Sequence, residues 1–485
     1  MVKTVDRLMV GSTAATATTS VNAPGTEPAC SSPQLQLAGK LKLRLDEDQL
    51  TNCMRCGFCL PACPTFRETG IEAESPRGRI ALMKAVADGL MMPDQSFEEQ
   101  MSHCLGCRAC EPACPADVKY GQLIEQTREA IEEHTESHRW WVKPLRQVVF
   151  KQLFPHQKRV RLLGGAMQLY QQSGLRKLAR SSGVMKLLPA HLSEMEEVLP
   201  YASSKGIVQK IGSHHPAKGV KIASVGLFRG CLMDMLFTET NIKTVELLTE
   251  AGFEVFIPDT QACCGALHAH SGETEDARSL ARLNIAAFQA AGVDYIVSNA
   301  GGCGAILTEY DHLLHEDEQW REGAVWLAKR VVDISDLLIR SGKLATAQMK
   351  EQPIRITYQD SCHLRNVMRS ADAPRKLLRE VSGAEFVEMF EADRCCGSAG
   401  TYNIVQPEMA GGLLARKMEH ANATKAHYLL TSNPGCLLQM KLGVAKHGDG
   451  QMQVQHIVDF LHERLVHNSP DIAQEQAEEQ AAGNV

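Results

Sequence analysis

The stretch CMRCGFCLPACP, residues 53–64, recurs in the same chain as CLGCRACEPACP, residues 104–115. Both copies follow C-x2-C-x2-C-x3-C-P, the spacing with which bacterial two-cluster ferredoxins bind two [4Fe–4S] clusters. Three thiolates on a short loop can hold three corners of a cubane cluster. The fourth corner is out of reach, so the cysteine before the proline binds the other cluster. We therefore assign one cluster to Cys53, Cys56, Cys59 and Cys114, and the other to Cys104, Cys107, Cys110 and Cys63.

Zinc and disulfide bonds are the two alternatives for these eight cysteines. A structural zinc site takes four ligands, typically two C-x2-C pairs with a longer spacer, which a duplicated eight-cysteine block does not match. Disulfides would require an export signal, and the N-terminal sequence shows none. The spacing therefore favours iron–sulfur clusters.

The composition is that of a large enzyme subunit rather than of a nucleic-acid-binding or membrane-spanning protein. The 485 residues are 44% hydrophobic, and the formal net charge is −6. No stretch approaches the roughly 18 consecutive apolar residues of a membrane span. Residues 1–37, which contain the unmatched Cys30, read as a disordered leader, and residues 468–485 as a disordered tail. We expect a cytoplasmic location.

The two motifs lie in a first domain, residues 38–140. Ser75 is expected to cap a helix that begins with Pro76 at its first position. A second helical pattern runs over residues 123–138. The sequence thus predicts a mostly helical two-cluster domain.

A basic segment follows, within a helical connector expected at residues 141–215. Residues 142–190 contain ten Lys or Arg and no Asp or Glu, with Trp, Phe and Leu interspersed. Such a segment can lie on an anionic membrane or dock on an acidic partner. Alternatively, it packs its apolar side on the neighbouring domains and leaves its charges in water. The basic residues are Lys143, Arg146, Lys151, Lys158, Arg159, Arg161, Arg176, Lys177, Arg180 and Lys186.

The rest of the chain repeats itself, which predicts two similar domains at residues 216–345 and 350–467. In each, an apolar strand runs into a cysteine, a Cys-Cys-Gly follows after 31 or 32 intervening residues, and a second strand leads to a fourth cysteine. Helical stretches between the strands indicate parallel α/β units. Ligands in such sheets bind beyond the carboxyl ends of the strands, where these cysteines fall. The first set is Cys231, Cys263, Cys264 and Cys303, and the second is Cys362, Cys395, Cys396 and Cys436.

Each of these domains offers four thiols that can bind a further iron–sulfur cluster or zinc, or form a redox-active dithiol. Adjacent cysteines rarely form a disulfide with each other, because the ring strains the peptide between them. The alternative is that some of the eight are small buried hydrophobic side chains. The overall expectation is an α+β multidomain protein, with a mostly helical ferredoxin-like domain followed by two similar α/β cysteine-rich domains.

The chain resembles a known family at several of these motifs. The N-terminal block is similar to the two-cluster domain of glycolate oxidase iron–sulfur subunits, for which PRGR (76–79) and CLGCRAC (104–110) are typical. The C-terminal halves resemble the cysteine-rich (CCG) domains of heterodisulfide reductases and of the anaerobic glycerol-3-phosphate dehydrogenase iron–sulfur subunit. CCGSAGTY (395–402) and GCGA (302–305) fit the glycolate oxidase group best. The resemblance covers residues 45–465.

One departure from the heterodisulfide reductase type is visible. There the CCG domain ends in C-x-x-C, which supplies a fifth thiol, but Ile306 and Gln439 stand at those positions here. His268, His270 and His363 could contribute as ligands, although a lone histidine is more often structural.

The resemblance implies an electron-transfer subunit that serves a flavin-containing partner, which oxidises glycolate to glyoxylate. FAD is expected on that partner, since no G-x-G-x-x-G stands in this chain. No catalytic pair of side chains is recognisable either, so we assign no catalytic residue. The alternatives are the iron–sulfur subunit of another flavin-dependent dehydrogenase, for lactate or glycerol-3-phosphate, and a heterodisulfide-reductase-like thiol/disulfide enzyme. No nucleic-acid partner is expected, and residues 142–190 offer the means of peripheral contact with the inner face of the cell membrane.

Overall fold

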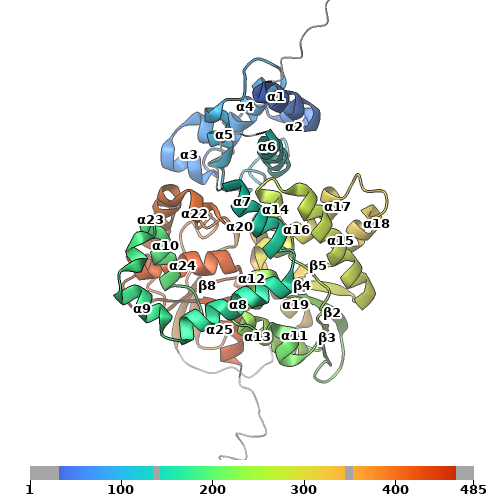
Figure 1. Ribbon diagram of the computed structural model, residues 1–485. Helices are drawn as coiled ribbons and strands as arrows, with labels where there is room; N and C mark the ends of the chain where they lie inside the picture. Colours follow the sequence, from blue (N-terminus) through green and yellow to red (C-terminus); the bar gives the residue numbers. More distant parts are fainter. Residues whose placement is uncertain (1–31, 135–141, 344–352, 466–485) are drawn as a thin grey trace, which may run out of the picture.

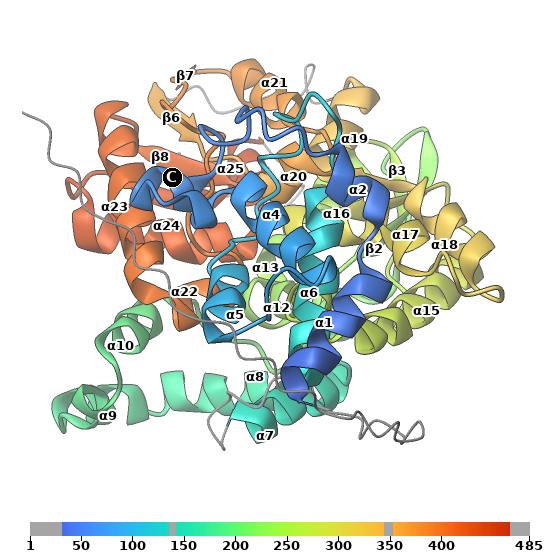
Figure 2. The ribbon, with the colours of Figure 1, turned by 90° about the horizontal axis from the view of Figure 1, so that it is seen from above.

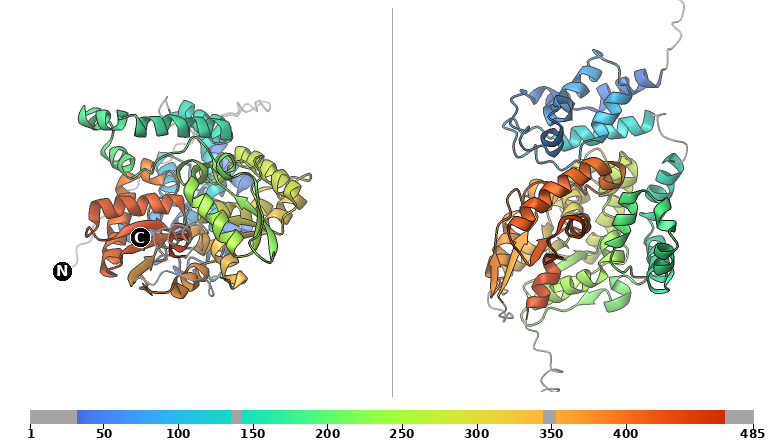
Figure 3. Two further views of the ribbon diagram at one scale, coloured as in Figure 1. Left: turned by 90° about the horizontal axis from the view of Figure 1, so that it is seen from below. Right: turned by 90° about the vertical axis from the view of Figure 1, so that its left-hand side faces the viewer.

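The computed structural model describes residues 32–134, 142–343 and 353–465. A small helical domain sits on one end of a larger body formed by two α/β domains (Figure 1). A run of short helices lies along one side of that body (Figure 3). The expected α+β multidomain architecture is confirmed.

The first domain contains helices and loops but no strand within residues 32–134. Ser75 caps α4, its Oγ accepting a hydrogen bond from Gly78 N at 2.9 Å, and Pro76 begins that helix as expected. Leu41, Met83, Met101 and Leu123 are fully buried between the helices. The helices are α1 (Pro33–Arg44), α2 (Glu47–Asn52), α3 (Pro64–Thr69), α4 (Pro76–Ala87), α5 (Gln95–Ser102) and α6 (Tyr120–His134), with the 3₁₀ turn η1 (Glu72–Glu74).

Helix α1 corrects the expected boundary of the leader at residue 37. It begins at Pro33, with Ser32 as its N-cap, and buries Leu37 and Leu41 against α4 and α6. Only Leu37 and Leu41 of this helix are buried, so most of its sequence is polar and resembles an unstructured leader. Residues 1–31 and the tail 466–485 lie outside the described residues.

The connector is helical and bridges the two α/β domains on one side. Helix α8 (Gln157–Gln172) packs on α12 (Cys231–Leu236) of the first α/β domain, and α10 (Ala190–Glu197) packs on α24 (Pro434–His447) of the second. The segments are α7 (Val142–Arg146), the π-helix η2 (Gln147–Leu153), α8 (Gln157–Gln172), α9 (Leu175–Ser181), η3 (Val184–Leu187) and α10 (Ala190–Glu197). Trp140 and Trp141 lie outside the described residues.

The first α/β domain has a five-stranded sheet in the order β1-β3-β2-β4-β5, parallel except at β1. Its strands are β1 (His214–His215), β2 (Ala223–Phe228), β3 (Phe253–Phe256), β4 (Tyr295–Ser298) and β5 (Val331–Asp333). Its helices are α11 (Ile207–Ile211), α12 (Cys231–Leu236), α13 (Thr238–Glu250), α14 (Ala266–His270), α15 (Thr274–Ala291), α16 (Gly301–Thr308), α17 (Tyr310–Leu313), α18 (Arg321–Ala328) and α19 (Ile334–Ser341). Because α11 and β1 belong to this domain, it begins before the expected residue 216.

The second α/β domain has a four-stranded, fully parallel sheet in the order β7-β6-β8-β9. This is the order of the first sheet without β1, so the internal repeat is structural as well as sequential. The strands are β6 (Ile354–Tyr358), β7 (Ala384–Phe386), β8 (Tyr428–Thr431) and β9 (Gln453–His456). The helices are α20 (Cys362–Asn366), α21 (Asp372–Glu380), α22 (Tyr402–Val405), α23 (Pro407–Ala423), α24 (Pro434–His447) and α25 (Ile457–Arg464).

The two domains share one apolar core. Val225 and Leu227 of β2 belong to the same buried cluster as Ile356 and Tyr358 of β6. Helix α13 of the first repeat corresponds to α21 of the second, and α19 corresponds to α25. Helix α13 packs on α25 and α21 packs on α19, so each repeat makes the same contact with the other. The helical domain lies over the α16–α20 contact between the repeats (Figure 2). No helix in the three described segments is long and apolar enough to cross a membrane.

Candidate iron–sulfur sites

The two cysteine loops of the first domain share one backbone conformation. The residue before the second cysteine has a positive φ in both loops, 55° at Arg55 and 65° at Gly106. The residue after that cysteine does too, 91° at Gly57 and 58° at Arg108. An L-residue rarely adopts such a φ, so two matching exceptions mark a loop whose shape the motif requires.

Each loop lines its own cavity. The first cavity, of about 430 Å³ counted to its open mouth, is lined by Cys53, Cys56, Cys59, Cys110 and Cys114 among others. The second, of about 300 Å³, is lined by Cys63, Cys104, Cys107 and Cys110. The last cysteine of each motif therefore lies at the cavity of the other motif, and Cys110 borders both cavities.

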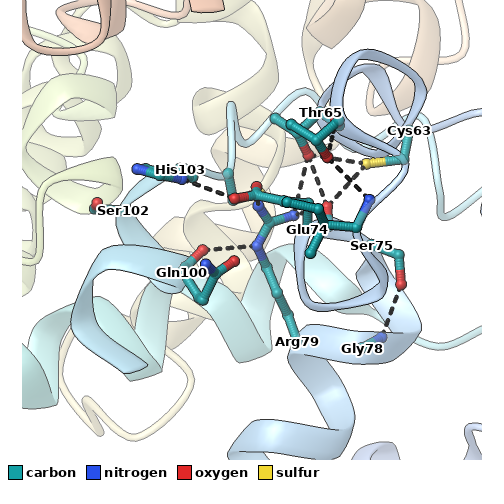
Figure 4. Close-up of polar contacts among 12 residues, drawn as sticks. Cys63, Thr65, Glu74, Ser75, Gly78, Arg79, Gln100, Ser102 and His103 are labelled. Atoms are coloured by element: carbon teal, nitrogen blue, oxygen red, sulfur yellow. Dashed lines mark hydrogen bonds and ion pairs between the residues drawn. The ribbon is translucent and has the colours of Figure 1, made fainter. Parts of the chain in front are cut away.

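A buried ion pair supports the second cavity (Figure 4). Arg79 is fully buried and pairs with Glu74 at 2.6 Å. Its guanidinium also donates to Thr65 Oγ1 at 3.2 Å, and that hydroxyl lies 3.3 Å from the sulfur of Cys63. His103 Nδ1 is 2.8 Å from the other carboxylate oxygen of Glu74. The second arginine of the PRGR stretch thus places positive charge beneath these thiols.

The donor set fits iron–sulfur clusters. Burial raises the pKa of the Cys107 and Cys110 thiols. At Cys104 burial acts in the same direction, but Arg79 and Arg128 outweigh it and lower the pKa of that thiol. Crowded, desolvated thiols give up their protons when metal cations take up the charge, and soft thiolate sets of this kind select iron–sulfur clusters.

In the first α/β domain, all four expected cysteines come together beyond the carboxyl ends of the strands. Cys231 is the first residue of α12, and its sulfur lies 3.5 Å from that of Cys263. Interaction with Cys231 lowers the pKa of Cys263, whereas interaction with Cys263 raises the pKa of Cys264. Cys303, in the first turn of α16, adjoins Cys264.

The second α/β domain repeats this arrangement. Its thiols interact in the order Cys362, Cys395, Cys396 and Cys436. Cys362 begins α20, and Cys436 lies in the first turn of α24. The amino ends of these helices favour negative charge on the sulfurs. We call the two groups the first and second CCG sites.

The occupant of the two CCG sites stays a prediction: a further iron–sulfur cluster, zinc or a redox-active dithiol. Within the three described segments, no three His, Cys, Asp or Glu side chains are placed to bind one ion.

Two of the three histidines considered from the sequence lie beside thiols. His268 is buried beside Cys263, and its Nε2 is 2.9 Å from the carbonyl oxygen of Phe150. His363 Nδ1 is 3.6 Å from the sulfur of Cys362, and burial lowers the pKa of His363 to about 3, which keeps the ring neutral. His270 instead pairs with Glu125 at 2.7 Å and stacks on His363.

The helical domain meets the second CCG site directly. Cys107, Cys362 and Cys395 belong to one buried apolar cluster. Asn366 donates a hydrogen bond to the carbonyl oxygen of Cys107 at 2.9 Å, and Tyr402 donates one to that of His103 at 2.9 Å. The sequence carries no signal for this contact, because its partners are about 250 residues or more apart.

Several basic side chains of the connector form ion pairs in the fold. Arg146 pairs with Glu273 and Arg161 with Asp259, while Arg176 and Arg180 share Glu196. Nine large apolar side chains nevertheless stay exposed in the described part of residues 142–190. They are Leu145, Val148, Leu162, Leu163, Leu169, Leu175, Leu178, Val184 and Leu188.

Comparison with known proteins supports each part of this architecture. Residues 49–118 match the family of 4Fe-4S dicluster domains, and residues 225–308 and 356–441 match that of cysteine-rich domains. Residues 141–199 match the linker region of glycolate oxidase iron–sulfur subunits.

Three relatives illustrate the similarity. A probable glycolate oxidase iron–sulfur subunit of Bacillus subtilis (strain 168) is 49% identical over 90% of this chain and 98% of its own length. The glycolate oxidase iron–sulfur subunit of Escherichia coli (strain K12) is 28% identical over 86% of this chain and 94% of its own. Lactate utilization protein A of Geobacillus thermodenitrificans (strain NG80-2) is 33% identical over 50% of this chain and 99% of its own.

Proposed function

This chain belongs to the family of glycolate oxidase iron–sulfur subunits, and we propose that it carries electrons within a glycolate-oxidising complex. A flavoprotein partner oxidises glycolate to glyoxylate and passes its electrons to this chain, which delivers them to an acceptor. The clusters supply one-electron redox chemistry when bound. The protein supplies thiolates, positive charge and burial, which set the potentials.

The observation that carries this proposal is the pair of adjoining thiol-lined cavities. Cys63 lies at the cavity of the second motif and Cys114 at that of the first. This placement supports the crossed ligand sets Cys53/Cys56/Cys59/Cys114 and Cys104/Cys107/Cys110/Cys63. Because Cys110 borders both cavities, the two clusters would lie side by side, as an electron relay requires.

The partner's approach is supported by the exposure of the first loop. Of the sixteen cysteines described, only Cys56 is exposed. Met54 and Phe58 beside it are exposed by 67% and 65%. Electron transfer slows steeply with distance, so the flavoprotein should dock where a cluster ligand reaches the surface. An apolar rim there is the kind of surface that a protein interface buries.

The connector supports a second contact, with an anionic lipid surface. Exposed leucines and lysines share this segment, which is the combination that interfacial helices use. The test is co-sedimentation of the full chain with anionic and with zwitterionic vesicles. Replacement of Leu162, Leu169 and Leu178 by Ser should abolish binding to anionic vesicles. A control triple replacement of Leu43, Leu90 and Leu283, which are likewise exposed but lie elsewhere, should leave binding unchanged. Equal binding by both variants, or none by the wild type, would refute the lipid contact.

The central experiment measures iron, zinc and acid-labile sulfide on the anaerobically purified chain, and then cluster reduction in the presence of the flavoprotein partner. About eight irons per chain correspond to two cubane clusters. Glycolate should reduce them only when the partner is present, and lactate or glycerol-3-phosphate should be poor donors. Iron near zero would refute the electron-transfer role. Preferential reduction by lactate or glycerol-3-phosphate would reassign the substrate, and reduction of a disulfide by the isolated chain would favour thiol/disulfide chemistry.

A further inference from the structure

The two CCG sites differ in charge at one equivalent position. Gly265 and Gly397 follow the paired cysteines, both in the left-handed region. A Cβ at either glycine would lie 3.3 Å from the Cα of an alanine on the following long helix, Ala277 on α15 or Ala410 on α23. These contacts align the two helices. Seven residues beyond the alanine, α15 carries Asn284 and α23 carries Lys417.

At the first site, the uncharged side chain of Asn284 hydrogen-bonds to the backbone around Cys263. Its Nδ2 donates to the carbonyl oxygen of Cys263 at 2.9 Å, and its Oδ1 accepts from Ala262 N at 2.8 Å. Its polar atoms are thus satisfied by neutral groups, and no cation stands at this position of the first repeat.

Lys417 is a buried cation at the second site. The residue is 3% exposed, and its ammonium donates to the carbonyl oxygen of Glu391. Within the described segments, no carboxylate oxygen comes within ion-pair distance of it. Burial lowers the pKa of Lys417 to about 8, and the groups that oppose this shift most are the thiols of Cys396 and Cys395. A buried charge without a partner is strongly unfavourable, so it demands negative charge nearby. Lys417 and Cys395 line the same cavity, so the second-site sulfurs are placed to supply that charge once they are deprotonated.

The second site is also the one that touches the helical domain. Cys107 packs with Cys362 and Cys395, whereas no cysteine of the first site belongs to that cluster. Cys303 of the first site instead packs beside Cys396 and Cys436. Of the two sites, the second is thus the one whose thiols share a buried cluster with a cysteine of the helical domain.

We propose that Lys417 is the fixed counter-charge of the second CCG site and makes that site, rather than the first, the electron acceptor for the ferredoxin-like domain. This inference rests on the proposed function. Cys104, Cys107, Cys110 and Cys63 would hold the donor [4Fe–4S] cluster, and the second-site thiolates would hold an acceptor iron–sulfur cluster, which would gain the one electron that the donor loses. No bond is made or broken, and Lys417 keeps its proton. A positive charge stabilises the additional negative charge of the reduced second site and so raises its reduction potential relative to the first.

The test replaces Lys417 with Met, which retains the length of the side chain and removes the charge. The full-length chain is titrated with redox mediators and followed by electron paramagnetic resonance. The second-site signal is identified by its loss in Cys395→Ala. We expect Lys417→Met to lower the ratio of reduced to oxidised second site at least tenfold at a fixed potential, a midpoint shift of about 59 mV for one electron. Lys417→Arg should restore the ratio, and Lys376→Met, an exposed lysine on α21, should leave it unchanged.

Stability provides the second readout. Because Lys417 is a buried charge without a carboxylate partner, Lys417→Met should keep or raise the melting temperature while it lowers the potential. A merely structural lysine would lose stability and leave the midpoint in place. An unmoved midpoint, an equal shift in Lys376→Met, or a titration without any centre beyond the two cubane clusters would overturn the inference. Iron and sulfide are measured on the same samples, so a chain without clusters refutes the proposed function, whereas a cluster-replete chain with an unmoved midpoint refutes this inference alone.

Discussion

The crossed ligand sets can be tested by counting iron in pairs of substitutions. Cys63 lies at the cavity lined by Cys104, Cys107 and Cys110, so Cys63→Ala should remove one cluster, about four irons per chain. Adding Cys104→Ala should remove nothing more, because both residues then belong to one cluster. Adding Cys53→Ala instead should empty both sites.

The assay is iron and acid-labile sulfide per chain after anaerobic purification, with circular dichroism to confirm that each variant is folded. Cys114→Ala serves as the matched control, since it should show the reverse pattern with its two partners. If each motif bound its own cluster, Cys63→Ala with Cys53→Ala would lose about four irons, and Cys63→Ala with Cys104→Ala would lose about eight. That result would refute the crossed assignment, and it needs no spectral assignment of either cluster.

Three further predictions concern stability, each measured by thermal unfolding. Arg79→Met leaves the buried Glu74 carboxylate with His103 as its remaining cation, and should destabilise the helical domain by about 3–5 kcal/mol; an unchanged melting temperature would contradict this. Burial raises the pKa of Asp333 to about 7, against 3.8 unfolded, so its neutral form stabilises the fold at low pH and that contribution is lost as pH rises from about 4 to 7. Asp333→Asn should therefore raise the melting temperature more at pH 8 than at pH 5, and an equal gain at both would exclude this cause. Removal of residues 1–31 should change neither iron content nor melting temperature, whereas removal through residue 44 takes away α1 and should lower both; identical behaviour of the two truncations would show that α1 is dispensable.

Much of the candidate site could be predicted because its determinants are local. The spacing of the ferredoxin cysteines is set by loops of a few residues, and the positive φ values at Arg55 and Gly106 show both loops adopting one shape. The cap at Ser75 and the strand at Tyr295–Ser298 also follow from neighbouring residues. The repeat of cysteines at strand ends predicted two parallel α/β units, since parallel strands place their carboxyl ends at one edge.

The domain boundaries at residues 37 and 216 differ from the structure because contacts between residues far apart in the chain decide them. Helix α1 looks like part of a polar leader until α4 and α6 cover Leu37 and Leu41. Strand β1 has two residues, and its pairing with β3 alone makes it a strand. The sequence does not show the ion pairs of Arg146 and Arg161 in the connector, because the acids that pair with them come from other elements.

Which cysteines can act together is predictable from the sequence, because ligand spacing is a property of short covalent segments. What surrounds these cysteines depends on how the chain folds. Lys417 reads as an ordinary helical lysine, and it becomes a buried charge because α23 packs that face against the second site. The contact of Cys107 with Cys362 and Cys395 likewise depends on how the helical domain docks on the paired repeats. Local chemistry follows from residues close in the chain, whereas desolvation and electron-transfer order follow from residues brought together by folding.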